Sequence, residues 1–524
     1  MDTDKAGRRL GYTRKQPRKS HSPHNAYPVP GTVPVPRDIF PGDSGLEPPP
    51  EEARLEPGDP RGRARWVVVS IASISSIPSI SPVACLGAYN CLLPQEDPVA
   101  MTQTAAFEEL SSFITALRVV DTHEHIPDEA VACADPLGFF GFLEHYVSSD
   151  FVSAGMPRET LEQVRTAGNG LSDLERWDLV APWWPHVRTT GYGRAMAEYM
   201  ADLFGVAEIG RDTIGTLCDR IRAARKPGWY RTVLRERAGI DRALVIRWPG
   251  QSVAVDRELF RAVPILDHFA MVSTRAELNA LEAETGRAIQ TLDQLLAALE
   301  ARLDGFGKEG IVAVKIFLAY RRSLRFDRVS KAEAARAFDR VWLSQALDLS
   351  QDDLKPLQDF VMRRIVALAA ERGLPVQIHT GLQEGNGNHL EHSHPLLLTD
   401  LIMDFPDARF ALFHAGWPWA GETAALAKYF PHVHADLCWI QVVSPASAAR
   451  ILDEWLDVIP SNKIFAVGGD SNYAEGAYGH CTIARRVAAR VLADKVDAGA
   501  FALDEAKRIA ARILRENAME FFRL

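Results

Sequence analysis

The chain has 524 residues, 47% hydrophobic and 24% charged, a composition typical of a globular protein with ample apolar material for a core. Its formal net charge of -9 argues against a nucleic-acid-binding protein, which would carry a basic excess. We therefore expect a small-molecule substrate and no nucleic-acid partner. Whether the chain forms a homo-oligomer stays open.

The six cysteines are scattered along the chain and form no CxxC pair, so they predict neither a thiolate metal site nor a disulfide framework. A reducing, cytoplasmic location fits this pattern. The longest apolar stretch near the beginning, residues 66–93, is interrupted by Pro78 and Pro82. A continuous membrane-spanning helix rarely contains such breaks, and we expect no membrane partner.

Residues 1–100 differ in composition from the rest of the chain. They contain a basic cluster, the run Pro48-Pro49-Pro50 and a serine-rich apolar stretch, a pattern that predicts disorder. A targeting peptide or a membrane anchor is the alternative. Because Met101 opens an amphipathic helical pattern, we expect it to be the natural start and the leader to be upstream sequence that is not part of the native protein.

From Met101 onward, short apolar β-branched runs alternate with longer helical patterns. Eight runs are strand-like: residues 117–121, 243–247, 263–268, 311–318, 374–379, 409–414, 432–437 and 463–470. Helical spacing lies between most of them, for example at 357–370 and 420–430. Buried strands that alternate with helices predict an α/β fold with a parallel sheet, and eight units predict a (β/α)8 TIM barrel over residues 101–524.

A long interval, residues 126–241, separates the first two predicted strands. It has a helical pattern and an aromatic group at Trp177, Trp183 and Trp184. Loops that follow barrel strands build the catalytic face. The interval therefore predicts a large helical insertion that forms a lid over the active site.

The motif Asp121-Thr122-His123-Glu124-His125 ends the first predicted strand. Alternate side chains of a strand share a face, so His123 and His125 point the same way and make half of a metal site. A second pair, His432 and His434, has the same spacing but begins its strand. Residues there face the stability end of a barrel, and we interpret this pair as structural.

Three later strand-like runs also end in groups that suit a metal site. Residues 374–379 end in His379, residues 409–414 end in His414, and residues 463–470 end in Asp470. The carboxyl ends of the strands of a barrel converge on one mouth, so these side chains are expected to meet His123 and His125 there.

The order HxH, strand-end histidine, strand-end histidine, strand-end aspartate resembles the amidohydrolase superfamily over most of residues 115–524. The segments 315–321, 377–381 and 413–416 are similar to its amidohydrolase-related branch, above all to the amidohydrolase half fused to type I glutamine synthetase-like proteins. The long insertion after HxH is similar to that of uronate isomerases.

The resemblance implies that His123, His125, His379 and Asp470 hold one divalent metal. Zinc is the first expectation, with manganese or iron as alternatives. His414 then lies beside the substrate or the attacking water, and Asp470 also accepts a proton. In binuclear members a carboxylated lysine bridges two metals, so a second metal is expected only if Lys315 is carboxylated; otherwise Lys315 contacts substrate or pairs with a carboxylate.

Arg247 and Arg321 follow predicted strand ends, where guanidinium groups suit a carboxylate-bearing substrate, although each could equally be a solvated or ion-paired arginine. The Trp417 side chain is expected either to line the pocket or to pack under the lid. The leading expectation is a metal-dependent hydrolase that uses activated water on a small carbonyl compound such as an amide or lactone. A decarboxylase, a uronate-type isomerase and a non-catalytic metal-binding regulatory domain are the alternatives.

Overall fold

The computed structural model describes residues 104–344 and 349–524, so the predicted leader at 1–100 lies outside the described residues. The described part contains eight strands, each overlapping one predicted run. They are β1 (Val119–Glu124), β2 (Ile240–Arg247), β3 (Phe260–Pro264), β4 (Val314–Ile316), β5 (Val376–His379), β6 (Phe410–Phe413), β7 (Val433–Asp436) and β8 (Ile464–Phe465).

All strand pairings are parallel, in the orders β1-β2-β3 and β4-β5-β6-β7-β8. Two links join these groups. Ile265, just after β3, forms a parallel bridge with Lys315 of β4, and the Thr122 N–H of β1 donates to the Val467 carbonyl beyond β8 at 3.1 Å. The strands therefore close into the predicted (β/α)8 barrel.

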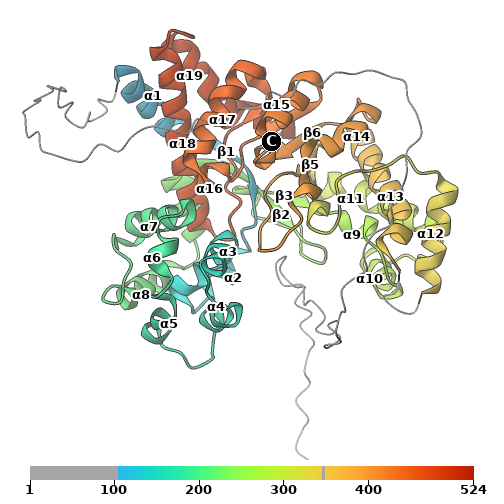
Figure 1. Ribbon diagram of the computed structural model, residues 1–524, viewed down its shortest axis with the longest axis horizontal. Helices are drawn as coiled ribbons and strands as arrows, with labels where there is room; N and C mark the ends of the chain where they lie inside the picture. Colours follow the sequence, from blue (N-terminus) through green and yellow to red (C-terminus); the bar gives the residue numbers. More distant parts are fainter. Residues whose placement is uncertain (1–103, 345–348) are drawn as a thin grey trace, which may run out of the picture. The chain divides into compact units, whose positions relative to one another are not determined.

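Helices follow every strand except β2, after which the described chain reaches β3 through a loop. After β3 come α9 (Asp267–Ala270), α10 (Arg275–Thr285) and α11 (Leu292–Glu309); after β4, α12 (Lys331–Leu343) and α13 (Gln351–Glu371); and after β5, α14 (Thr399–Asp404). After β6 comes α15 (Ala420–Tyr429), and after β7, α16 (Ile440–Val443) and α17 (Pro445–Val458). After β8 come α18 (Ala474–Asp497), α19 (Leu503–Ala511) and α20 (Asn517–Phe522). The helix before β1, α1 (Ala105–Ala116), packs with α19 against α18 (Figure 1).

Local sequence fixes where these helices begin and end. Ser330 caps α12 and Ser350 caps α13, each in a reciprocal box with the acidic residue three positions later. Gly310 ends α11 in a left-handed conformation, with φ of 74°, that glycine adopts without steric cost. None of the helices in the described part of the chain combines the length and apolarity needed to cross a membrane.

The interval between β1 and β2 is helical, as predicted. It contains α2 (Glu129–Cys133), α3 (Tyr146–Ser153), α4 (Arg158–Arg165), α5 (Asp173–Val180), α6 (Trp184–Val187), α7 (Gly191–Phe204) and α8 (Ile214–Ala224), with one π-helical turn at Arg231–Arg237. Phe139, Trp177 and Trp184 pack ring against ring with centroids 6.1–6.4 Å apart. This aromatic cluster gives the insertion a core of its own.

The barrel strands differ in what they bury. β5 and β6 are buried along their whole length, and Val376, Ile378 and Leu412 supply apolar core. β1 is equally buried although four of its six residues are polar. Buried polar groups require partners, so the end of β1 is where the fold departs from an ordinary core.

Candidate metal centre

His123 and His125 lie at the carboxyl end of β1, and their rings stand edge to face with centroids 5.0 Å apart. His123 is fully buried, and neither of its ring nitrogens has a hydrogen-bond partner among the described residues. A buried imidazole without partners is costly unless something outside the protein chain binds it. The strand alternation predicted from the sequence therefore brings two imidazoles together at the end of β1, and the His123 ring has no hydrogen-bond partner among the described residues.

Asp470 lies opposite this pair. Its Oδ1 is 3.4 Å from Nε2 of His123 and 3.2 Å from Nε2 of His125. The other oxygen, Oδ2, is 3.8 Å from Nδ1 of His414. The ligand atoms of His123, His414 and Asp470 all lie within 4.8 Å of one another. The structure thus places three of the four predicted histidines, His123, His125 and His414, around the carboxylate of Asp470.

The segment that carries Asp470 is held against β1 by backbone and carboxylate contacts. The Asp470 N–H donates to the His123 carbonyl at 2.8 Å, the Ser471 N–H donates to Oε2 of Glu124 at 2.8 Å, and the Gly469 N–H donates to Oδ1 of Asp121 at 3.2 Å. Asp470 has a φ of 53°, which non-glycine residues rarely adopt. These bonds hold that backbone conformation and aim the carboxylate.

Gly469 has a steric reason to be glycine. A Cβ at this position would lie 1.9 Å from Oε1 of Glu124, which is far inside van der Waals contact. Glu124, which points away from the histidine face, therefore approaches the backbone that carries Asp470 as closely as the chain permits. At Gly468 a Cβ would instead lie 2.6 Å from Cβ of Cys438, so close packing at each position accounts for the two glycines before Asp470.

His379, at the end of β5, lies beside His414. The two ring centroids are 4.3 Å apart, and Nε2 of His379 lies 2.9 Å from the Leu382 carbonyl. His414 has a φ of 64°, and its Nε2 is buried without a partner among the described residues. Nε2 of His414 is therefore free to bond a ligand. The ligand role of His379 stays a prediction and falls to its Nδ1, because Nε2 contacts the Leu382 carbonyl.

Two residues of the insertion, His145 and Tyr146, join the site and were not predicted. The Tyr146 hydroxyl donates to Oδ2 of Asp470 at 3.0 Å. The ligand atoms of His125, His145 and Asp470 also lie within 4.8 Å of one another. His145 precedes α3 with a φ of 56°, which turns both side chains toward the barrel. The only sequence signal was a histidine next to an aromatic residue at a helix start.

The electrostatics suit metal binding. Burial, reinforced by the Lys315 ammonium, lowers the pKa of His123 to about 3, and burial lowers the pKa of His145 to about 3. Burial alone would raise the pKa of Asp470, but the imidazoles of His123 and His125 hold it well below the usual value. Neutral imidazoles beside an ionised carboxylate are the donors that zinc, manganese and iron accept, so these residues fit a divalent cation.

Lys315 lies on β4 and is completely buried. Its Nζ has no hydrogen-bond partner in the described chain and lies 4.2 Å from the ring centre of Phe413 and 5.0 Å from that of Phe317. Burial lowers its pKa to about 8. An unpartnered buried amine fits either predicted role, contact with a substrate anion or carboxylation.

The three other predicted substrate contacts are placed differently. Nη2 of Arg247 is 3.0 Å from Oδ1 of Asp128, and Nη1 donates to the Ile126 carbonyl. Arg321 is exposed. Trp417 packs half-buried against the core, and its N–H donates to the His414 carbonyl at 2.9 Å. Arg247 therefore already has a carboxylate partner, and Trp417 contacts the site through the backbone of His414.

Comparison with known proteins agrees with this geometry. Residues 290–524 match the family model described as amidohydrolase. Protein fluG of Emericella nidulans is 27% identical over 230 residues, which cover 42% of this chain. The matched region is 26% of that protein, so the chain spans about a quarter of the length of this curated relative.

The fold is similar to that of solved uronate isomerases. The enzyme from Thermotoga maritima superposes with a TM-score of 0.66 at 17% identity, covering 80% of this chain and 97% of that one. Glucuronate isomerase from Caulobacter crescentus gives 0.61 at 16% identity, covering 81% and 95%. A Lactobacillus casei protein assigned to the metal-dependent hydrolases gives 0.58 at 17% identity, covering 79% and 97%. The amidohydrolase match over residues 290–524, the closed barrel and the HxH motif at the end of β1 together support an assignment to the amidohydrolase superfamily.

Proposed function

We propose that this chain is a metal-dependent hydrolase that attacks a small carbonyl compound, such as an amide or a lactone, with an activated water. The observation that carries the proposal is the convergence of His123, His125 and His414 on Asp470, with ring nitrogens of His123 and His414 left unpartnered in the described chain. When bound there, one divalent cation supplies Lewis acidity toward a carbonyl or a water. Zinc is the first candidate, with manganese and iron as alternatives.

The two oxygens of Asp470 have different surroundings, and we assign them different tasks. Oδ1 faces the HxH pair, which suits cation binding. Oδ2 faces the Tyr146 hydroxyl and His414, which suits holding a proton taken from the attacking water. Tyr146 donates to Oδ2 and fixes the direction from which that proton arrives.

His414 and Lys315 are the groups best placed to act on the substrate. Nδ1 of His414 lies 3.2 Å from the Cys438 carbonyl, which orients the ring, while Nε2 is free to bond a substrate oxygen or a leaving group. Lys315 acts electrostatically on the His414 ring, and its buried Nζ has no hydrogen-bond partner in the described chain, so it suits a substrate carboxylate or a developing oxyanion. A second metal enters the proposal only if Lys315 is carboxylated.

A non-hydrolytic reaction is the second candidate. The Thermotoga maritima uronate isomerase fold matches this chain over 80% of its length, and the insertion places the Tyr146 hydroxyl on Oδ2 of Asp470. A hydroxyl and a carboxylate in contact suit a proton moved between two substrate carbons as well as one taken from water. Decarboxylation belongs to the same non-hydrolytic class.

Steady-state assays of metal-loaded protein on amides, lactones, aromatic acids and uronates in 18O-labelled water separate these reactions. Hydrolysis places one labelled oxygen in the product, isomerisation conserves the substrate mass, and decarboxylation releases carbon dioxide without incorporating label. Asp470→Asn is expected to lower kcat by roughly 100- to 10,000-fold as a lost proton acceptor. Bound metal without turnover on any substrate class would instead favour a non-catalytic domain.

A further inference from the structure

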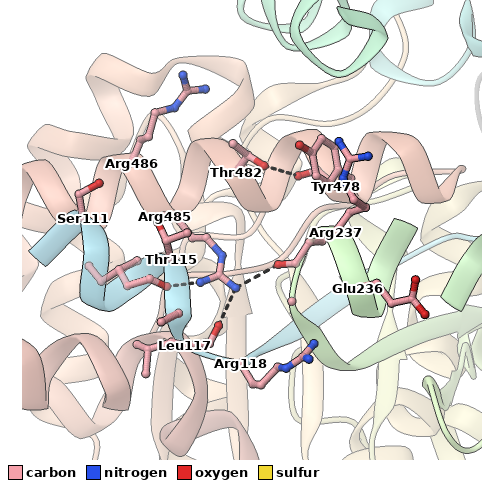
Figure 2. Close-up of a pocket in the computed structure, with 14 residues that line it drawn as sticks. Ser111, Thr115, Leu117, Arg118, Glu236, Arg237, Tyr478, Thr482, Arg485 and Arg486 are labelled. Atoms are coloured by element: carbon pink, nitrogen blue, oxygen red, sulfur yellow. Dashed lines mark hydrogen bonds between the residues drawn. The ribbon is translucent and has the colours of Figure 1, made fainter. Parts of the chain in front are cut away.

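A cavity of about 390 Å³ lies at the opposite end of β1 and β2 from the metal centre. Its walls come from α1, from the residues that lead into β1 and β2, and from the middle of α18 (Figure 2). β1 has six residues, and a strand advances about 3.3 Å per residue, so roughly 20 Å separates the cavity from the HxH pair. None of the proposed catalytic groups lines it.

Four arginines line this cavity: Arg118, Arg237, Arg485 and Arg486. Arg485 is the buried member of the set. Its guanidinium donates to the carbonyls of Ile114, Leu117 and Ala238 and so joins α18 to both strand-leading segments, as Figure 2 shows for the labelled residues. No carboxylate pairs with it in residues 104–344 or 349–524. Carbonyl oxygens satisfy its hydrogen bonds and leave its positive charge uncompensated.

Two of the exposed arginines also lack carboxylate partners in the described chain. Arg118 donates to the Arg235 carbonyl, and Arg237 donates to the Asp202 carbonyl and lies over the Tyr478 ring. Each keeps other N–H groups available, since a guanidinium carries five.

The acidic groups near the cavity do not balance this charge. Glu198 pairs with Arg486, and the Asp202 carboxylate accepts a hydrogen bond from the Tyr478 hydroxyl. Glu236 is the one acidic side chain in the cavity lining. Three guanidinium groups without carboxylate partners in the described chain therefore line a cavity whose lining contains one acidic side chain, Glu236.

We propose that this cavity binds a small organic anion that carries a phosphate or a carboxylate. Planar guanidinium groups bind both anions through paired N–H donors, and Arg118 and Arg237 are exposed and able to turn onto such a ligand. Arg485 supplies a fixed positive charge at the wall. The apolar side chains of Ile114 and Leu117 line the same space and suit the carbon skeleton of the ligand.

The ligand would join three parts of the chain. Arg118 precedes β1, Arg237 precedes β2, and Arg485 comes from α18. A ligand that contacts all three binds the folded chain and not the unfolded one, so it raises the melting temperature, and the rise grows with the logarithm of ligand concentration above Kd. This site is independent of the reaction assigned to the metal centre.

Isothermal titration of the full-length, metal-loaded chain with inorganic phosphate and with citrate, at constant ionic strength, tests the proposal. We expect one equivalent of at least one anion to bind. Tighter binding of phosphate indicates a phosphate site, and tighter binding of citrate indicates a carboxylate site. The exposed double variant Arg118→Gln/Arg237→Gln is expected to weaken binding at least tenfold. The charge-matched control Arg188→Gln/Arg328→Gln, whose arginines pair with surface carboxylates elsewhere, is expected to bind within twofold of the original chain.

Three results would overturn the proposal. The first is the absence of saturable binding by either anion. The second is an equal loss in both double variants, which indicates general charge attraction. The third is binding that His123→Ala abolishes while Arg118→Gln/Arg237→Gln leaves it unchanged, because the anion then occupies the metal centre.

Discussion

The two ends of the barrel carry the same histidine motif in different surroundings. At the carboxyl end of β1, His123 and His125 face the carboxylate of Asp470. At the start of β7, Nε2 of His432 lies 3.1 Å from the Ile402 carbonyl, and His434 stacks on Phe465 at 5.5 Å. No carboxylate pairs with the second pair in the described chain. Position along the strand, and not the spacing of the motif, decides which histidine pair faces the carboxylate of the proposed metal centre.

Two buried lysines extend the comparison. Nζ of Lys463, just before β8, donates to the carbonyls of Ala427 and Phe430. Lys315, in β4, has no such partner among the described residues. Burial lowers the pKa of both to about 8. One amine is satisfied by the fold, whereas the other is available to a ligand.

Removing one histidine from each pair gives the largest expected contrast. His123→Ala deletes a proposed ligand, so we expect metal affinity to fall by more than about 100-fold, beyond what changes outside the ligand set cause. His434→Ala is expected to keep full metal content and lose only packing stability. Metal analysis of both purified variants measures this. Full metal content in His123→Ala would contradict the assigned centre.

A methyl group at Gly469 tests how tightly β1 holds the Asp470 segment. The added Cβ meets Oε1 of Glu124, so Gly469→Ala is expected to cost about 1–3 kcal/mol of unfolding free energy. The same change at Gly307 in α11, where a Cβ meets nothing within 4 Å, is expected to stabilise by about 0.5–1 kcal/mol. Urea denaturation measures both. Equal effects at the two glycines would refute the close approach.

Replacing each lysine by methionine tests whether Lys463 stabilises the fold and whether Lys315 serves the site. Lys463→Met leaves two carbonyls without their donor and is expected to cost about 1–3 kcal/mol. Lys315→Met removes an unpartnered buried charge, so the metal-free chain should be as stable as the original or more so, while turnover falls. Denaturation and kcat/KM together measure this. A large loss of stability in Lys315→Met would mean that the fold needs this amine.

The smallest expected effect is the pH dependence of the stability difference between Lys315→Met and the original chain. In the metal-free chain the folded pKa of Lys315 is about 8, below the unfolded value of about 10.4. The unfolded chain therefore binds more protons between these values, and the cost of burying Lys315 is full below pH 8 and falls as pH rises. The stability advantage of Lys315→Met should shrink from pH 8 to pH 10. A constant difference would show that the amine is not desolvated.

The features predicted correctly from the sequence are those that depend on position along a strand. Buried apolar runs placed all eight strands, and a polar residue at a strand end was enough to bring His414 and Asp470 to the HxH pair. Ring direction was not predictable in this way, because the contact of His379 with the Leu382 carbonyl depends on the conformation of a loop. For Arg247 the sequence left open a substrate contact or an ion pair, and Asp128, in the loop after β1, pairs with it.

The contribution of the insertion to the site was also not predicted from the sequence, because it depends on local backbone conformation. His145 and Tyr146 reach Asp470 because His145 adopts a backbone conformation with positive φ, which the sequence does not signal at a non-glycine residue. A helical pattern indicates which face of a helix is buried, but it does not indicate what the residue before the helix points at. The predicted lid was thus located as a segment, whereas its contact with the centre came from the structure.

Main-chain bonds to β1 hold Asp470 in place, so the carboxylate and the β1 imidazoles face one another across the contact between the first and the last strands of the barrel. Closure of the barrel and assembly of the proposed metal centre therefore depend on the same bonds. A change that opens this seam should weaken both the stability of the barrel and the affinity for metal.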